Sequence, residues 1–199
     1  MADIRLENVS KSFEEKTVLS GLSLTVREGE AVTIMAPSGY GKTTLLRLLL
    51  GLEKPNGGSI SGTDCRMCPV FQEDRLSPEH TPIENLRPVL SRHTPPTETE
   101  KCLADLGLEV SCFAQPISEF SGGMARRVAI ARALLAEGEW LVLDEPFRGL
   151  DEETRARAAA CILARRKGRG ILLVCHDPVE AELLSARIIR LDELQEKKS

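Results

Sequence analysis

The chain has 199 residues, of which 42% are hydrophobic and 28% are charged, and its formal net charge at pH 7 is −4. These values are typical of a soluble globular protein that can build one substantial core. The acidic balance and the lack of a long basic run speak against a nucleic-acid-binding surface, and no apolar stretch approaches the ~18 residues of a membrane-spanning helix.

The first thirty-five residues predict β-structure with short turns. Apolar residues alternate with polar ones over 4–9 and again over 22–26, as in half-buried strands. We expect a polar turn over 11–16. Its one aromatic residue, Phe13, is either a core residue or a flat surface on which a base can stack.

The most informative stretch of the chain follows the apolar, partly β-branched run 31–35, which reads as a buried strand, and precedes the apolar run 44–50, which reads as a buried helix. It consists of Ala36, Pro37, Ser38, Gly39, Tyr40, Gly41, Lys42 and Thr43. A glycine-containing loop between a strand and a helix is the context that a phosphate-binding loop requires.

In such a loop, Gly39 and Gly41 let successive N–H groups face one concavity, to which the helix adds its positive N-terminal end. Lys42 then reaches the β- and γ-phosphates, and the Thr43 hydroxyl binds Mg²⁺. The pattern normally opens with glycine, and here that place is Ala36. The alternative is therefore an ordinary strand-to-helix turn with a surface lysine.

The first helix is expected to end near Gly51, before a strong turn signal at 54–58. Short strands at 59–61 and 67–71 should follow. From Gln72 to about Phe120 the chain has more prolines and more charge, so we expect a small helical lobe over about 73–120, inserted between strands.

Within this lobe, the residues 97–100 fit a capping box that opens a helix, and that helix should close at Gly107. Just before the lobe, Cys65 and Cys68 have the spacing of half a zinc site or of a redox motif, but no second pair stands at a ligand-like spacing. The six cysteines are scattered through apolar segments, and the first residues lack the layout of a signal peptide. Both features favour reduced thiols in a cytoplasmic protein.

After residue 120 the pattern of a core returns. Helices are expected at 121–137, 151–167 and 178–184, strands at 140–143, 171–175 and 187–191, and a solvated tail at 196–199. Strands that alternate with helices predict an α/β fold whose mainly parallel sheet is covered on both faces.

Two acids, Asp144 and Glu145, end a buried strand, which is where ligands bind in open α/β sheets. One carboxylate can hold Mg²⁺ while its neighbour polarises an attacking water; the alternative is a common acidic turn. Gln72 follows another strand and could ligate Mg²⁺ through its amide oxygen. His176 also follows a strand directly, either as a structural histidine or as a contact for a γ-phosphate.

Ser121, Gly122 and Gly123 stand just before a helix. Two glycines and a serine at a helix N-terminus make a second anion-binding corner. The alternative is that Ser121 is a simple N-cap after a flexible turn.

In this order along the chain, the residues resemble the motifs of the ATP-binding subunit of ATP-binding cassette (ABC) transporters. The matches are Phe13 (adenine-stacking loop), 36–43 (Walker A), Gln72 within 70–75 (Q-loop), 121–124 (signature), 141–145 (Walker B), 149–151 (D-loop) and His176 (switch histidine). The resemblance covers nearly the whole chain. The segments 71–76, 121–124 and 176–181 are most similar to the nitrate/sulfonate/taurine importer branch.

The resemblance implies one ABC ATPase domain over residues 1–199, with a P-loop NTPase core, an N-terminal antiparallel β-lobe and the inserted helical lobe. ATP would stack on Phe13 and bind its phosphates in the loop 36–44, which includes Thr44. Mg²⁺ would be held by Thr43, Gln72 and Asp144. The catalytic roles would fall to Lys42 on the phosphates, Glu145 as the general base and His176 at the γ-phosphate.

The resemblance also implies partners. Ser121, Gly122, Gly123 and Asp151 would complete the ATP site of a second copy, so that a homodimer sandwiches two ATP molecules. A membrane permease would dock beside Gln72 and the helical lobe, and a periplasmic or lipid-anchored solute-binding protein would act indirectly. The chain would lie on the inner face of the cell membrane and power import of a small anion, without nucleic acid.

Two alternatives stay open within the family. An ABC-type ATPase that moves no solute, such as a DNA-repair or translation factor, usually carries long coiled-coil insertions or two cassettes. A non-hydrolysing regulatory subunit is opposed by Asp144, Glu145 and His176. Two departures from the family pattern are Ala36 and a short segment between 57 and 71, from which we expect a trimmed β-lobe.

Overall fold

The computed structural model describes residues 2–14 and 16–194. Its strands are β1 (Ile4–Phe13), β2 (Lys16–Val26), β3 (Ala31–Met35), β4 (Gly57–Ser61), β5 (Met67–Val70), β6 (Trp140–Asp144), β7 (Gly170–Val174) and β8 (Arg187–Arg190). Its helices are α1 (Lys42–Leu49), α2 (Pro82–Leu86), α3 (Pro96–Asp105), α4 (Gly122–Leu135), α5 (Glu152–Arg165), α6 (Pro178–Leu183) and α7 (Leu191–Leu194). Short 3-10 turns are η1 (Arg87–Val89), η2 (Val110–Ala114) and η3 (Ile117–Glu119).

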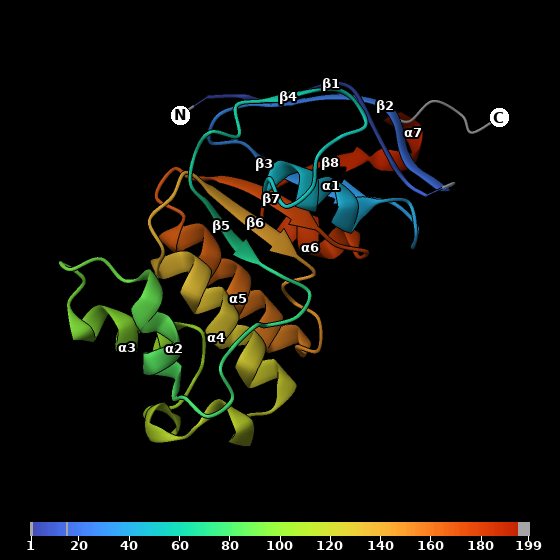
Figure 1. Ribbon diagram of the computed structural model, residues 1–199. Helices are drawn as coiled ribbons and strands as arrows, with labels where there is room; N and C mark the ends of the chain where they lie inside the picture. Colours follow the sequence, from blue (N-terminus) through green and yellow to red (C-terminus); the bar gives the residue numbers. More distant parts are fainter. Residues whose placement is uncertain (1, 15, 195–199) are drawn as a thin grey trace.

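A parallel sheet with the order β5-β6-β7-β3-β8 forms the centre of the molecule. Its three middle strands are mainly apolar and are buried throughout, because both faces of the sheet are covered. A second, antiparallel sheet with the order β2-β1-β4 lies above it in Figure 1. These sheets confirm the expected α/β fold with an N-terminal antiparallel β-lobe.

Alternate residues of the parallel sheet enter two different cores. On one face, Ile171 and Leu173 of β7 pack with the apolar residues of α4 and α5 and with the helical lobe. On the other face, Leu172 and Val174 pack with α1 and with the antiparallel sheet. The loop between β3 and α1 therefore stands at the carboxyl end of a strand that is fixed from both sides.

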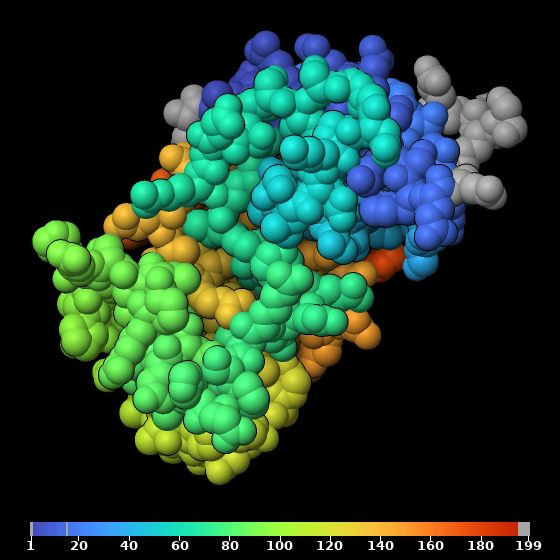
Figure 2. Space-filling model, in the orientation of Figure 1, coloured from blue at the N-terminus to red at the C-terminus, as the bar shows by residue number. Residues whose placement is uncertain are grey.

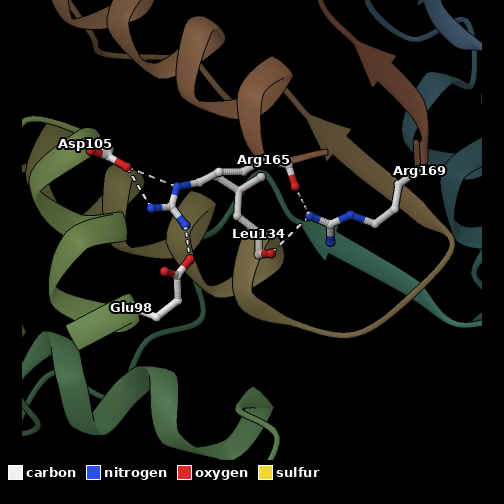
Figure 3. Close-up of polar contacts among 5 residues, drawn as sticks. All are labelled: Glu98, Asp105, Leu134, Arg165 and Arg169. Carbon is white, nitrogen blue, oxygen red and sulfur yellow. Dashed lines mark hydrogen bonds and ion pairs between the residues drawn. The ribbon is translucent and has the colours of Figure 1, made fainter. Parts of the chain in front are cut away.

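The helical lobe packs against α4 and α5 and forms the lower part of the molecule in Figures 1 and 2. Arg165 at the end of α5 holds it, because its guanidinium lies 2.6 Å from Glu98 and 2.7 Å from Asp105, both on α3 (Figure 3). Beside it, the buried Arg169 donates to the carbonyl oxygens of Leu134 and Arg165 (Figure 3). Arg169 thereby satisfies carbonyls at the negative C-terminal ends of α4 and α5.

Two expectations about local structure were wrong. The polar turn is shorter than 11–16, because Phe13 still pairs with Lys16 across the β1–β2 hairpin. The capping box at 97–100 does not exist, since α3 already begins at Pro96 with Pro95 as its N-cap. A proline at the first helical position lacks only an N–H that would have no helical partner, so the helix starts there.

The capping box of the lobe lies earlier, at Thr81 and Glu84, where α2 begins. At the other end of the chain, β8 stops at Arg190 and Leu191 opens the short helix α7, which the sequence pattern did not indicate. The expected tail at 196–199 lies outside the described residues. No helix in the described ranges has both the length and the apolar character needed to cross a membrane.

Candidate functional site

The loop from Ala36 to Gly41 joins the buried strand β3 to α1, as expected for a phosphate-binding loop. Gly39 has φ +83° and Gly41 has φ +90°, conformations that favour glycine. A Cβ at Gly41 would also stand 2.8 Å from Leu19 Cδ2 and 2.9 Å from Val18 Cγ1. Gly41 is therefore required both by its backbone conformation and by the hairpin that packs against it.

Lys42 folds back across the loop. Its Nζ donates to the carbonyl oxygens of Ala36 at 2.7 Å and Pro37 at 3.1 Å, and the residue is only 7% exposed. Burial lowers the pKa of Lys42, while the carboxylates of Glu145 and Asp144 oppose that shift. A positive charge is thus held at the mouth of the loop, where an anionic ligand would compensate for its burial. The alternative of a surface lysine does not fit this position.

Asp144, the last residue of β6, lies beside α1 and is 5% exposed. Burial and the neighbouring Glu145 raise the pKa of the Asp144 carboxyl, and a hydrogen bond from Thr43 opposes the shift. Asp144, Thr43 and Gln72 line one groove. A carboxylate, a hydroxyl and an amide oxygen are the hard oxygen ligands that Mg²⁺ prefers. The donor set therefore fits the metal expected from the sequence.

Glu145 begins the turn after β6 with φ +48°, which is uncommon for a residue with a side chain. Its N–H donates to the carbonyl oxygen of Val174 at the end of β7, at 2.9 Å. The side chain of His176 comes from the end of the same strand, and its Nε2 lies 2.9 Å from Glu145 Oε1. Backbone strain of this kind is often found at functional sites.

One cleft of about 260 Å³ at the carboxyl edge of the parallel sheet contains Lys42, Glu145 and His176. Asp144 lines a neighbouring groove, which shares Thr43 and Gln72 with this cleft. It is lined by Val18, Ser38, Gly39, Gly41, Lys42, Thr43, Thr44, Gln72, Glu145, Val174 and His176. The structure therefore brings together most of the residues singled out for the phosphates and for catalysis. Such a cleft combines N–H groups, a buried ammonium and a polarising acid, which can bind a phosphate chain and activate a water molecule.

Ser121 forms a corner with Gly122 and Gly123, called here the Ser121 corner. This corner lines a different hollow, of about 540 Å³, across from Gly149, Leu150 and Asp151. The Ser121 side chain accepts from the N–H of Met124 at 3.2 Å, so the N-cap alternative is also correct. Ser121 and Gly122 are nonetheless exposed to solvent. Ser121, Gly122 and Gly123 do not belong to the lining of the phosphate cleft.

Asp151 has a structural role as well. Its carboxylate accepts from the N–H of Thr154 at 2.8 Å and from the Thr154 hydroxyl at 2.9 Å, so Asp151 is the N-cap of α5. The hydrogen bond from the Thr154 N–H is the main cause of its lowered pKa. Asp151 is exposed and lines the same hollow as the Ser121 corner.

The two aromatic residues of the predicted site lie at its periphery. Phe13 ends β1 and is 42% exposed, with Lys11 Nζ 4.8 Å from its ring centroid. Tyr40, at the tip of the phosphate loop, is 43% exposed. Among the described residues, neither is part of the lining of the phosphate cleft.

Sequence reasoning missed two groups near the site. Arg126 on α4 donates to the backbone of Gln72, which no local pattern indicates because the two residues are far apart in the chain. Glu180, at the start of α6, has its pKa raised to about 7 by burial and by the nearby Asp177. Its spacing of four residues from His176 was the only signal of its presence.

Comparison with known proteins gives consistent matches. The profile of the ABC transporter family matches residues 19–148. The chain is 43% identical over 196 residues to the aliphatic sulfonates import ATP-binding protein SsuB 3 of Rhodococcus jostii, covering 95% of this chain and 71% of that protein. It is 42% identical over 196 residues to SsuB 1 of Nocardia farcinica, covering 95% of this chain and 78% of that protein.

A solved structure is similar over the whole fold. It is the dimeric post-hydrolysis state of the ATP-binding cassette MJ0796 bound to ADP and Pi, with a TM-score of 0.83 and 30% sequence identity. The superposition covers 98% of this chain and 97% of that chain. The shared arrangement therefore includes the lobe and both sheets.

Proposed function

This chain belongs to the ABC transporter family, and from that premise we propose that it is the ATP-hydrolysing subunit of an importer for small sulfonate-type anions. Its membership confirms the resemblance carried by the motifs, and the ATP-binding, ATP-hydrolysing function is that of the family. The alternative of an ABC-type ATPase without a transport role is not favoured, because the relatives matched at 42% and 43% identity are import proteins.

The observation that carries the proposal is the common cleft of Lys42, Thr43, Gln72, Glu145 and His176. Backbone N–H groups of the loop and the Lys42 ammonium hold the β- and γ-phosphates of ATP. Glu145 accepts a proton from the attacking water, and His176 contacts the γ-phosphate from the end of the neighbouring strand. Phe13 offers the exposed ring on which adenine stacks.

Mg²⁺ is part of this proposal. Thr43, Asp144 and Gln72 supply oxygen atoms for it, and the buried Asp144 carboxylate provides the negative charge. When bound, the ion neutralises the charge that develops on the phosphates during transfer.

We further propose that two copies form the complete enzyme. Ser121, Gly122 and Gly123 line a hollow other than the phosphate cleft, and Ser121 and Gly122 are exposed, so this corner can seal an ATP molecule held by another copy. Asp151, opposite them, would lie at the same interface. The related cassette MJ0796, which is described as dimeric, supports this arrangement.

The chain would act as one ABC ATPase domain whose helical lobe, over about 73–120, faces a membrane permease. It would associate peripherally with the cytoplasmic side of the membrane through that permease, and a solute-binding protein would deliver the anion. The groove that Thr43, Gln72 and Asp144 line, between α1 and the segment after β5, also contains apolar side chains that could contact a permease. These are Leu46, Leu50, Leu52 and Phe71.

The transport function is tested by expressing the chain with the permease and binding-protein genes beside its own. We expect it to copurify with a polytopic membrane protein. In proteoliposomes, that complex should take up a sulfonate only when ATP is supplied to this subunit. A chain that hydrolyses ATP but binds no membrane protein would support the soluble-factor alternative.

A further inference from the structure

Gln72 lies where the phosphate cleft and the hollow of the Ser121 corner meet. It lines the cleft together with Lys42 and Glu145, and it also lines the hollow together with Ser121. Of the described residues, only Gln72 lines both the phosphate cleft and the hollow. Whatever fixes Gln72 therefore acts on both sites.

Arg126 fixes the backbone at Gln72. It projects from α4 about one turn after the Ser121 corner and is 5% exposed. Its guanidinium donates to the carbonyl oxygens of Phe71 at 2.6 Å and Gln72 at 2.5 Å. Its Nε lies 3.1 Å from Asp74 Oδ1, so the guanidinium contacts residues on both sides of Gln72.

The chemistry of these contacts requires arginine. A planar guanidinium can donate to both carbonyls while its charge pairs with Asp74, whereas an ammonium is a compact charge without that fixed fork. Burial raises the pKa of the Asp74 carboxyl, and the charges of Arg126 and Arg132 oppose the shift. Removal of Arg126 would leave two partly buried carbonyls and one carboxylate without this partner, which is costly.

We propose that Arg126 is a positioning residue that couples the two nucleotide sites of the ATP-bound dimer. The inference rests on the proposed function, since it needs the Ser121 corner to meet the ATP molecule of a second copy. That ATP then acts on the N-terminus of α4, and Arg126 transmits the resulting position of the helix to Gln72. Gln72 in turn faces the phosphates of its own subunit, so each site senses whether the other is filled.

Arg132 supplies a matched control on the same helix. Its guanidinium donates to the carbonyl oxygens of Asp74 at 2.8 Å and Arg75 at 2.7 Å. It thus anchors the same segment without touching the carbonyls of Phe71 or Gln72, and it belongs to the lining of neither hollow. A purely structural role in holding this segment would be shared by both arginines.

The experiment compares Arg126→Lys with Arg132→Lys in the full chain. The readouts are the Hill coefficient of ATP hydrolysis, the values of kcat and KM, and ATP binding by the monomer. The Hill coefficient cannot exceed the number of coupled sites. We expect Arg126→Lys to lower it toward 1 and to reduce kcat on the order of tenfold, as for a misplaced active-site group.

Monomer affinity for ATP should change by less than about twofold in Arg126→Lys, because Lys42 and the loop are untouched. Arg132→Lys should keep the Hill coefficient of the unmodified chain. The coupling role would be overturned if Arg126→Lys kept the Hill coefficient of the unmodified chain. It would also be overturned if Arg126→Lys and Arg132→Lys lowered the Hill coefficient equally. If Arg126→Lys does not fold, Asp74→Ala serves instead, because it removes the carboxylate that orients the guanidinium; unchanged cooperativity there would equally overturn it.

The proposed function fails in a different way. An unmodified chain that never dimerises with ATP, or that hydrolyses ATP with a Hill coefficient of 1, would contradict the two-copy enzyme itself. Cooperative hydrolysis by the unmodified chain that persists in Arg126→Lys would contradict only the coupling role.

Discussion

His176 Nε2 lies 2.9 Å from Glu145 Oε1, although the two residues follow different strands of the parallel sheet. The register that pairs Asp144 with Val174 brings the residues that follow both strands to the same edge of the sheet. The proposed general base and the proposed γ-phosphate contact therefore face each other across the phosphate cleft. In this position each can touch the same water molecule or phosphate oxygen.

The first prediction follows from this pair. Glu145→Gln should slow ATP hydrolysis by ~10²–10⁴-fold, because the amide cannot accept the proton of the attacking water. ATP binding should persist, since the loop and Lys42 are unchanged. Phosphate release under saturating ATP measures the rate, and unchanged hydrolysis would show that Glu145 is not the base.

The second prediction concerns Lys42, whose ammonium is buried against the carbonyls of Ala36 and Pro37. Lys42→Ala should abolish measurable ATP affinity, because the loop loses its only side-chain cation in the described cleft lining. Lys101→Ala, an exposed lysine on α3, is the control and should bind ATP normally. Isothermal titration compares the two, and retained affinity in Lys42→Ala would contradict the phosphate-loop assignment.

A third prediction tests the packing beneath the loop. Gly41→Ala should destabilise the chain and weaken ATP binding, because the new methyl group would meet Leu19 and Val18 at less than 3.0 Å. Gly51→Ala is the matched control, since Gly51 also has positive φ but a methyl group added there would meet no heavy atom within 4 Å. Both variants incur backbone strain of ~1–3 kcal/mol. Urea denaturation should show a larger loss in the free energy of unfolding for Gly41→Ala than for Gly51→Ala.

Much of the fold and most of the cleft could be predicted from local patterns. The middle strands of the parallel sheet are short apolar runs bounded by turns, and a strand buried on both faces leaves that pattern in any context. Gly39, Gly41 and Lys42 were found because the phosphate loop is continuous in the chain. Even Asp144 and Glu145 could be placed, since ligands bind beyond the carboxyl ends of such strands.

The remainder depends on contacts between distant segments. Arg126 and Gln72 are separated by 54 residues, so no sequence window contains their hydrogen bond. The predicted start of α3 was wrong because the helix begins at Pro96 with Pro95 as its N-cap, one residue before the Thr-x-x-Glu pattern that suggested a capping box. Ser121 was predicted either as a ligand contact or as an N-cap, and the structure shows the N-cap directly. The use of Asp151 as the N-cap of α5 became visible only in three dimensions.

The fourth prediction uses Glu180, a half-buried acid at the start of α6 near Asp177. The pKa of Glu180 is raised from 4.5 to about 7, so between these values the folded state binds more protons than the unfolded state. The stability contributed by Glu180 is therefore present at low pH and is lost as the pH rises through this window. Glu180→Gln should lose less stability than the unmodified chain between pH 5 and pH 8.

Glu182→Gln provides the comparison for this experiment, because Glu182 is on the same helix and is exposed. Denaturation at the two pH values gives the difference in the free energy of unfolding. If Glu180→Gln and Glu182→Gln show the same pH dependence, Glu180 does not titrate in this range.

The central claim is that one copy's phosphate loop and the other copy's Ser121 corner enclose the same ATP molecule. Sedimentation of Glu145→Gln with and without Mg²⁺-ATP tests it most directly, because this variant should keep the nucleotide unhydrolysed. We expect a monomer without nucleotide and a dimer with it, and the dimer should disappear when Ser121→Arg is added. A Glu145→Gln chain that stays monomeric while saturated with ATP would contradict the account.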